Sequence, residues 1–290
     1  MSNYVILTDS SADLTAELYK ELDVELLPLT FLLEGKSYEN LPDESSMKFS
    51  EVYAKLRGGA NIQTSAVNVE AFQRAYRPFL EKGMDILYLG FSSGLSSTYS
   101  AGCIAAEEMK EEFPERKILT VDTLCASLGQ GMLVYHTAKK RLEGASIEEA
   151  AEYAESTKQN VVHWFTVDDL FFLKRGGRVN AATALLGSAL GIKPVLHVDS
   201  EGHLINVSKV RGRKNSIQAL ADKMVQTAID PARQTPFIVH GDCIEDAEYL
   251  ADLLRERCGV KDVVINYVGP VIGAHSGPGT LALFYIGTER

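Results

Sequence analysis

The sequence predicts an α/β protein of two domains, in which an α/β/α sandwich with a parallel sheet precedes a domain with a mixed sheet. In the first half, short apolar runs alternate with helical segments, a pattern that implies right-handed crossovers between parallel strands. In the second half, a hairpin around Ser200-Glu201-Gly202 requires antiparallel pairing. A length of 290 residues suits two domains of ordinary size. We place the boundary near residue 160, which gives domains of 1–160 and 161–290.

The elements of the first half follow one another without a long linker. Asp9 or Ser11 can cap the first helix, because short polar side chains accept hydrogen bonds from the free N–H groups of a first turn. Pro28 interrupts the second apolar run, which places that run at a sheet edge or a bend. A polar passage over 36–48 joins it to the next helix. The expected strands are 4–8, 24–35, 85–91 and 117–123, and the expected helices are 9–22, 49–59, 63–80 (with its preceding turn), 96–113, 124–145 and 146–159.

The second half has a different order of elements. The hairpin is expected over 193–210, between helical segments, so antiparallel strands and crossovers must share one sheet. The expected strands outside the hairpin are 161–167, 235–242, 260–268 and 281–287, and the expected helices are 168–177, 181–191, 213–229 and 245–259.

Composition excludes several functional classes. The net charge of −10 argues against a protein that binds a nucleic acid backbone, which needs a basic face. Four widely spaced cysteines and six scattered histidines form no metal-binding pattern, and no phosphate-binding glycine motif is present, so we expect neither metal nor cofactor. No signal peptide or membrane span is recognisable. The sparse thiols fit a reducing cytoplasm.

Three hydroxyl-rich segments follow predicted strands of the parallel sheet: 8–11, 63–68 and 92–100. Ligands of such sheets bind beyond the carboxyl ends of the strands, where helix N-termini offer free N–H groups to an anion. A single carboxylate would be satisfied by two or three neutral donors, whereas a phosphate normally recruits Arg or Lys as well. Helix capping explains any one of these segments alone. Three at one sheet edge favour a binding site.

The glycine-rich segment 272–283 surrounds His275, and its composition suits a backbone that lies close to a ligand. A serine hydrolase could combine Ser96 and His275 with Asp9 or Asp122, but the GxSxG pattern is absent. Cys125, at a strand–helix turn, is more simply a buried structural residue.

Two basic spots stand out in this acidic chain, RGGR at 175–178 and the RGRK that contains Arg211. Compensation of a helix dipole explains the first, and ordinary solvation explains the second. Alternatively, both could form a surface that docks an acidic or phosphorylated partner.

Together these motifs resemble the DegV family of bacterial fatty-acid-binding proteins, which includes the FakB subunits of fatty acid kinase. The resemblance covers nearly the whole chain. It rests on eight motifs in order: TDSSADL at 8–14, QTSAVN at 63–68, SSGLSSTYSA at 92–101, VDT at 121–123, DLFFLKRGGRV at 169–179, GIKPVL at 191–196, KVRGRK at 209–214 and GPVIGAHSGPGTLAL at 269–283.

The resemblance implies a parallel α/β/α domain, a two-layer α/β domain with a mixed sheet, and a lipid tunnel between them. It implies that Thr64 and Ser96 hold a fatty-acid carboxylate, with His275 beside them. It also implies that Arg178 and Arg211 contact a FakA-type kinase, which phosphorylates the presented fatty acid with ATP. The chain itself would be a carrier and not an enzyme.

Some assignments stay open within this resemblance. A sensor without an enzymatic partner is a further alternative, and acyl length and oligomeric state are not predicted. Ser97 stands where the family has Gly, and TSAVN, ending at Asn68, replaces the usual TSxPS. Segments 182–191 and 25–33 are the candidates for the tunnel wall.

Overall fold

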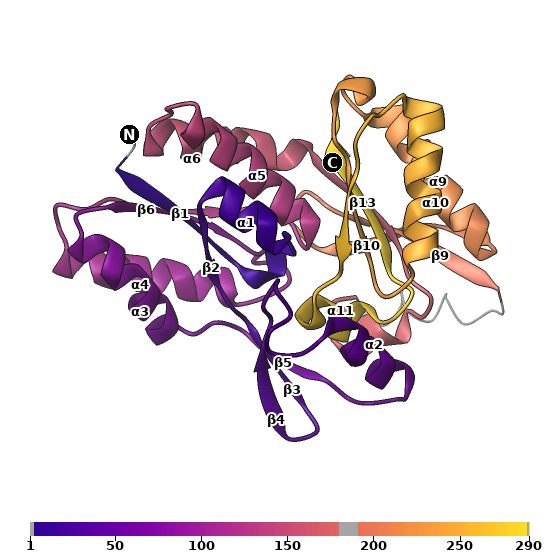
Figure 1. The fold of residues 1–290 in the computed structure, drawn as a ribbon, viewed down its shortest axis with the longest axis horizontal. Coiled ribbons are helices and arrows are strands. Elements are labelled where there is room, and N and C mark those ends of the chain that lie inside the picture. The colour runs from indigo at the N-terminus through magenta and orange to yellow at the C-terminus, as the bar shows by residue number, and fades with distance from the viewer. Residues whose placement is uncertain (1–2, 180–190, 289) are drawn as a thin grey trace.

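The first half of the chain forms a four-stranded parallel sheet in the computed structural model, which describes residues 3–179, 191–288 and 290 (Figure 1). The strand order is β2-β1-β6-β7. Strand β2 is an edge strand and ends at Leu27, immediately before Pro28, as predicted from that proline. The strands of this sheet are β1 (Tyr4–Asp9), β2 (Val24–Leu27), β6 (Asp85–Gly90) and β7 (Ile118–Asp122).

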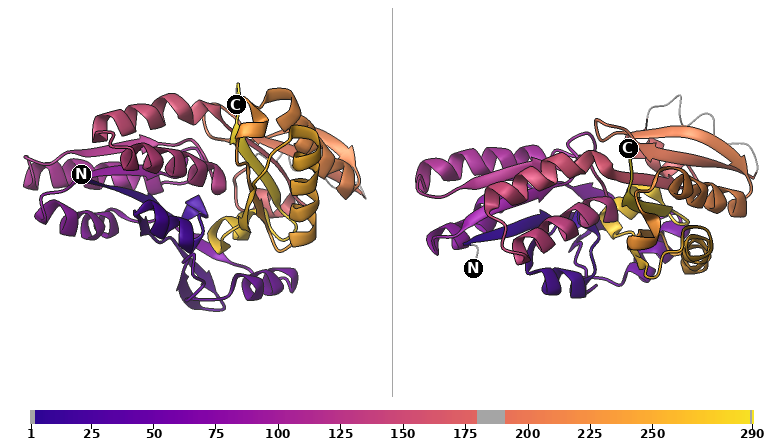
Figure 2. Two further views of the ribbon diagram at one scale, coloured as in Figure 1. Left: turned by 45° about the horizontal axis from the view of Figure 1, so that its top comes forward. Right: turned by 90° about the horizontal axis from the view of Figure 1, so that it is seen from above.

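Helices cover both faces of this sheet, which confirms the predicted α/β/α sandwich. One face carries α3 and α4, and the other carries α1, α5 and α6 (Figures 1 and 2). Their bounds are α1 (Ala16–Leu22), α3 (Val69–Glu81), α4 (Thr98–Glu112), α5 (Leu128–Leu142) and α6 (Ile147–Thr157). A short 3-10 helix, η1 (Ser10–Ala12), joins β1 to α1, with Asp9 as its N-cap.

A small antiparallel sheet lies beside the first one, and the sequence prediction missed it. Its order is β4-β3-β5, with bounds β3 (Thr30–Leu33), β4 (Lys36–Glu39) and β5 (Gln63–Ser65). The prediction treated 24–35 as one segment, 36–48 as a connection and the start of 63–80 as a turn. The strands are only three or four residues long, so their periodicity is too short to recognise.

The second half forms a six-stranded mixed sheet of order β10-β9-β8-β13-β11-β12. Only the β11–β12 pair is parallel, so the predicted mixed sheet with its hairpin is confirmed. Its strands are β8 (Val161–Thr166), β9 (Ile192–Val198), β10 (Leu204–Arg211), β11 (Phe237–His240), β12 (Val264–Tyr267) and β13 (Leu281–Ile286).

The two faces of the mixed sheet meet different layers. Helices α9 (Arg213–Thr227) and α10 (Ile244–Cys258) pack on the outer face around a separate apolar cluster. The inner face meets α5 of the first half, and one continuous core reaches from the parallel sheet to residues such as Phe165 and Phe284. The space between the two sheets is therefore bounded by both halves.

Two further contacts involve α11, and the first of them crosses between the halves. Helix α2 (Phe49–Arg57) packs on α11 (Pro270–Ser276), and the Tyr53 hydroxyl donates a hydrogen bond to the Val268 carbonyl at 2.7 Å. Short helix α7 (Phe171–Arg175) also contacts α11. The prediction placed no helix around His275, whereas α11 continues to Ser276 and is followed by Gly277 and Gly279, both at positive φ.

Candidate functional site

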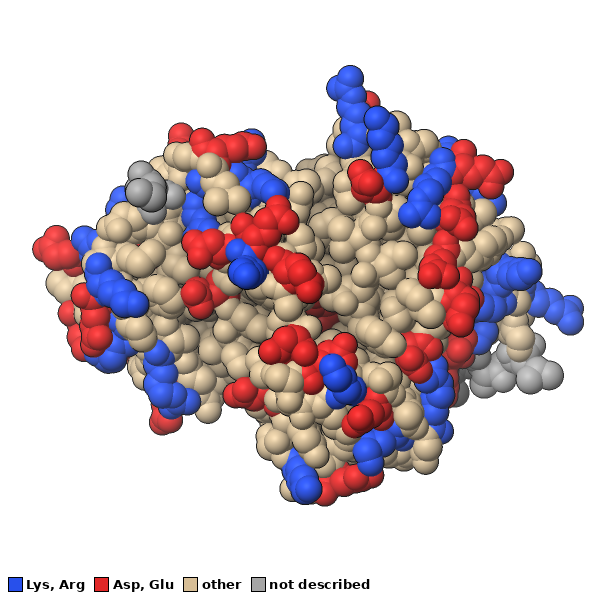
Figure 3. Space-filling view, viewed as in Figure 1, with Lys and Arg blue, Asp and Glu red and all other residues tan. Residues whose placement is uncertain are grey.

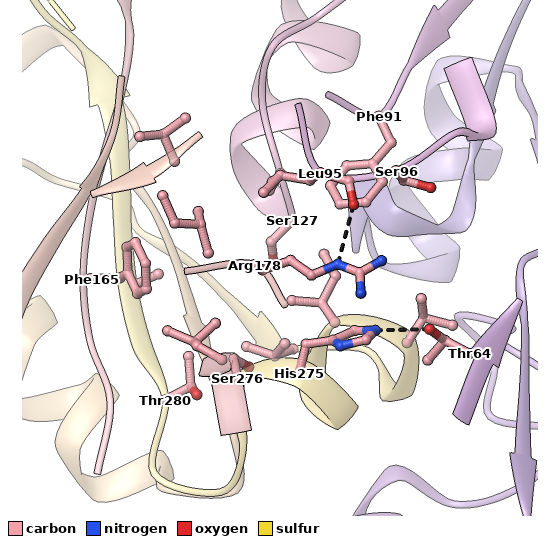
Figure 4. A pocket seen from close by; sticks show the side chains of 18 of the residues that line it. Thr64, Phe91, Leu95, Ser96, Ser127, Phe165, Arg178, His275, Ser276 and Thr280 are labelled. Atoms are coloured by element: carbon pink, nitrogen blue, oxygen red, sulfur yellow. Dashed lines mark hydrogen bonds between the residues drawn. The ribbon is translucent and has the colours of Figure 1, made fainter. Parts of the chain in front are cut away.

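A cavity of about 320 Å³ lies between the two sheets, and both halves contribute to its wall (Figure 4). Most of the wall is apolar, and its polar side chains include Thr64, Ser96, Arg178 and His275. The lining residues are Leu29, Thr64, Ser65, Ala66, Phe91, Leu95, Ser96, Ser97, Ala126, Ser127, His163, Phe165, Leu173, Arg178, Val198, Leu204, Val239, Val268, Val271, Ile272, His275, Ser276, Thr280, Ala282 and Phe284.

Thr64 and His275, more than two hundred positions apart in the sequence, meet in this wall. Thr64 lies at the centre of β5, and His275 lies in the last turn of α11. The Thr64 Oγ1 and His275 Nε2 atoms are 2.8 Å apart and share one hydrogen bond (Figure 4). Gly176 faces the other side of the ring, where a Cβ would lie 2.3 Å from His275 Nδ1. The imidazole is thus held between a hydroxyl and a glycine backbone.

The surroundings of His275 keep its ring neutral at pH 7. Burial is the main reason that its pKa falls to about 4, and the positive charges of Arg178 and Arg175 lower it further. A neutral imidazole can donate one hydrogen bond and accept another. His275 can therefore donate a hydrogen bond to one polar group and accept a hydrogen bond from another.

Ser96 lies in the loop between β6 and α4, on the same cavity. Its Oγ is 2.9 Å from the Thr98 hydroxyl and accepts a hydrogen bond from the Thr98 backbone N–H at 3.2 Å. This bond satisfies the N–H of Thr98, the first residue of α4, although the N-cap is Ser97, which makes no side-chain capping bond. Ser96 also faces the cavity, as the site prediction requires.

The two residues that depart from the family motifs differ in position. Ser97 lines the cavity with its neighbour Ser96. Asn68 is the N-cap of α3, and its side chain accepts a hydrogen bond from the Ala71 N–H at 2.9 Å. The first departure therefore touches the candidate site, whereas the second serves a helix terminus.

The two predicted partner-contact arginines lie in different environments. Arg178 is half-buried in the cavity wall, where its Nε donates to the Leu95 carbonyl at 3.2 Å and its guanidinium also bonds the Gly176 carbonyl. In Figure 4 this guanidinium lies between Ser96 and His275. Burial lowers the pKa of Arg178. Arg211, at the end of β10, is exposed and does not line the cavity.

The structure does not assemble the hydrolase triad. Asp9 is buried, and its carboxylate accepts hydrogen bonds from the Tyr88 hydroxyl and the Phe91 N–H. The Asp122 carboxylate accepts hydrogen bonds from the Leu124 N–H of its own loop and from the Ser93 N–H of the loop that follows β6. Within the part of the chain that the structure describes, His275 has no carboxylate as a hydrogen-bond partner. Without an orienting carboxylate and a bond from Ser96 to His275, the serine lacks its base.

The other candidates have plain outcomes. Burial raises the pKa of the Cys125 thiol to about 11, in agreement with a structural role. Of the proposed wall segment 25–33, Leu29 lines the cavity. The other proposed wall segment, 182–191, lies outside the described residues except for Gly191.

Sequence reasoning missed Ser127 and the walls formed by β8, β9 and β13. These strands come together only in the folded chain, so the sequence alone did not show which of their residues line the cavity.

Two features are absent from the described residues. In residues 3–179, 191–288 and 290, no group of three or more His, Cys, Asp or Glu side chains could hold a metal ion. No helix in the same ranges is long and apolar enough to cross a membrane. On the face shown in Figure 3, acidic and basic side chains are interspersed over both halves.

Comparison with known proteins gives one consistent result. A family model described as an uncharacterised protein of the DegV family matches residues 3–288. A DegV domain-containing protein from Clostridium perfringens is 45% identical over 291 residues, which cover 100% of this chain and 99% of the relative.

Solved structures agree with this match. A DegV lipid-binding protein from Thermotoga maritima has a TM-score of 0.86 and 30% identity, and the alignment covers 100% of both chains. A DegV family protein from Thermus thermophilus, described by its fatty acid binding, has the same TM-score and identity over 98% of this chain and 99% of that chain.

Proposed function

This chain belongs to the DegV family, and we propose that it binds one long-chain fatty acid in the cavity between its two sheets. One observation carries the proposal: an apolar cavity has Thr64, Ser96, Arg178 and His275 gathered on one side. Phe165 lies on the opposite side in Figure 4. An amphipathic ligand with one polar end and a long apolar tail matches this distribution.

The apolar wall would supply most of the affinity. Burial of a methylene group stabilises by about 0.8 kcal/mol, so a tail of about 14 methylenes offers on the order of 11 kcal/mol. Ordering of the ligand and its loss of translational freedom oppose this gain. The cavity of about 320 Å³ lies at the small end of the roughly 300–1,000 Å³ that is usual for ligand pockets.

The polar side would hold the carboxylate. We assign direct contacts to the hydroxyls of Thr64 and Ser96 and to the ring of His275. The half-buried guanidinium of Arg178 lies within the same wall and supplies a positive charge that compensates the ligand. A hydrogen bond to a charged group contributes about 1.5–3 kcal/mol, so these contacts orient the ligand and add to its affinity.

We propose further that the bound carboxylate is presented to an ATP-dependent kinase of the FakA type in the cytoplasm. A carboxylate oxygen would form a bond to the γ-phosphorus of ATP while the bond between that phosphorus and the bridging oxygen to the β-phosphate breaks. The products are acyl-phosphate and ADP. Exposed Arg211 is our candidate for contact with the kinase, and Arg178 would connect that surface with the carboxylate.

Organic extraction of the purified protein, followed by mass spectrometry, tests the binding proposal directly. We expect one fatty acid per chain, or one equivalent bound after incubation with palmitate or oleate. A protein that is empty and takes up neither acid would contradict it. Labelling of Ser96 by a fluorophosphonate, with turnover of activated esters, would favour the hydrolase instead.

The kinase role needs its own test. Arg211→Ala is expected to bind palmitate like the unchanged protein but to slow acyl-phosphate formation with a FakA-type kinase and ATP. Arg257→Ala, which removes an arginine from the outer helix α10, is the control. Equal rates for both variants and the unchanged protein would remove Arg211 from the proposed docking surface.

A further inference from the structure

Asp13 contacts both halves of the molecule although it does not line the cavity. It follows η1, is buried, and has a φ of 50°, in the left-handed region. Its carboxyl group and its carbonyl accept three hydrogen bonds, one from the first half and two from the second. Each of these bonds fixes a different part of the structure.

The first bond fixes a residue of the cavity wall. The Ser127 hydroxyl donates to Oδ2 of Asp13. Ser127 lines the cavity and is the N-cap of α5, with φ 53° and ψ −144°, a conformation that few residues other than glycine adopt. Such a conformation persists only where surrounding contacts enforce it. The carboxyl group of Asp13 is one of those contacts.

The other two bonds fix the start of α11. The Gly269 N–H donates to Oδ1 of Asp13 at 3.1 Å, and the Asn266 side chain donates to the Asp13 carbonyl at 2.7 Å. Gly269 is the N-cap of α11, and a Cβ there would lie 2.5 Å from Oδ1, so the approach requires glycine. His275 follows six residues later on the same short helix. The position of Gly269 therefore sets the position of the imidazole.

We propose that Asp13 is a positioning residue, which holds the wall at Ser127 and the helix that carries His275 in the register that a bound carboxylic acid needs. This inference rests on the proposed fatty-acid binding. Asp13 itself makes no contact with the ligand. Its carboxyl group joins two elements that come from different halves, the start of α5 at Ser127 and the N-cap of α11 at Gly269.

Three variants separate positioning from general stability. Asp13→Gly removes the carboxyl group and accepts a positive φ without strain. Asp13→Asn keeps both hydrogen bonds, because its amide oxygen can accept from Gly269 and its NH₂ can donate to Ser127. Arg141→Ala is the control, since buried Arg141 donates to the Leu22 and Asp23 carbonyls at the opposite end of α5.

Palmitate affinity is the main readout, with thermal stability measured beside it. We expect Asp13→Gly to bind palmitate about tenfold or more weakly, Asp13→Asn to bind within about threefold of the unchanged protein, and Arg141→Ala to lose stability at unchanged affinity. Equal affinity for Asp13→Gly and the unchanged protein would overturn the inference. So would an Asn variant that binds as weakly as the Gly variant.

Two measurements keep the inference testable if Asp13→Gly does not fold. Ser127→Ala deletes one hydroxyl, and we expect its palmitate affinity to fall by about threefold; unchanged affinity would contradict the role of that bond. The amide resonance of Gly269 in an NMR spectrum should keep its position in Asp13→Asn, and a large shift would contradict the retained bond. If the unchanged protein binds no fatty acid, the proposed function fails first, and the two failures are distinguishable.

Discussion

The polar and the apolar sides of the cavity are built in different ways. The apolar side consists of regular strands whose alternate residues face inward, such as Phe165 on β8 and Phe284 on β13. The polar side consists of a three-residue strand, a loop and a seven-residue helix, which supply Thr64, Ser96 and His275. Regular strands are stabilised by their own ladders, whereas these short pieces depend on contacts across the molecule. Mutations on the apolar side should therefore change the preferred acyl-chain length and the stability of the fold, whereas mutations on the polar side should change the affinity for the carboxylate.

The largest expected effect concerns the apolar side. Phe284→Ala should lower the free energy of unfolding by about 3–5 kcal/mol, because it leaves a cavity in the core. Since Phe284 lines the binding cavity, the variant should also favour longer acyl chains than the unchanged protein. Denaturant unfolding and competition between fatty acids of different length measure the two effects.

Phe237→Ala is a matched control. Phe237 pairs with Phe284 in the sheet and is equally buried, but it packs against Tyr135 of α5. We expect a similar loss of stability with an unchanged preference for chain length. If both variants shifted the preference, the difference between wall and core assumed here would be wrong.

A smaller effect is expected on the polar side. Thr64→Val keeps the volume of the side chain but removes the hydroxyl that pairs with His275. Palmitate affinity should fall about 10- to 100-fold, as for the loss of a hydrogen bond to a charged group. Thermal stability should change little. Titration calorimetry measures this affinity. Thr120→Val is the control, because Thr120 lies in β7 and does not line the cavity, and its affinity should be unchanged.

The pH dependence of binding should show the smallest effect. The pKa of His275 is about 4 in the free protein, mainly through burial, and a carboxylate placed beside the ring raises it. Binding then takes up a proton, so affinity should increase as the pH falls from 7 toward 5, above the range in which the carboxyl group of the fatty acid is itself protonated. The gain is about tenfold for each pKa unit of the rise. In His275→Gln this dependence should be reduced, and an identical pH profile would contradict contact between His275 and the carboxylate.

The stability of the free protein should change with pH in the opposite direction. The folded-state pKa of His275 lies below its usual value near 6.5, so the folded state resists protonation of the ring. Stability that is present above pH 6.5 is lost as the pH falls through 6.5 toward 4. Burial also lowers the pKa of His163 and His240, which adds to the same loss. Binding experiments at acidic pH therefore need a parallel unfolding measurement.

The two sides of the cavity were also unequally predictable from the sequence. Long strands such as β8 and β13 have clear apolar patterns, so the parallel sheet and the mixed sheet were predicted, whereas the small sheet β4-β3-β5 was missed. Helix α11 was missed because its glycines suggest irregular backbone, although Pro270 at its first position is a helix-start signal that could have revealed it. The segments that contain Thr64, Ser96 and His275 were recognised from their hydroxyl and glycine content, and the family motifs implied the individual residues. Their proximity was not predicted, because the contact between Thr64 and His275 joins distant parts of the chain.

The position of Arg178 shows the same limit. From the sequence, the glycines before it suggested a helix end with a basic surface. In the structure, Gly176 lets the His275 ring pack against the backbone, and the guanidinium turns into the cavity wall. The bond between Ser127 and Asp13 also spans distant segments. Local sequence patterns contain no information about such pairs.

The docking of α2 on α11 has a consequence for biosynthesis. The Tyr53 hydroxyl finds its acceptor, Val268, only after most of the chain has left the ribosome. The wall strand β13 emerges later still. Contacts of such large sequence separation form slowly, so part of the apolar surface of the first half stays exposed to solvent until the second half has been synthesised and has folded against it. A nascent chain therefore cannot load its ligand during translation, and lipid present at that stage would meet an unfinished cavity.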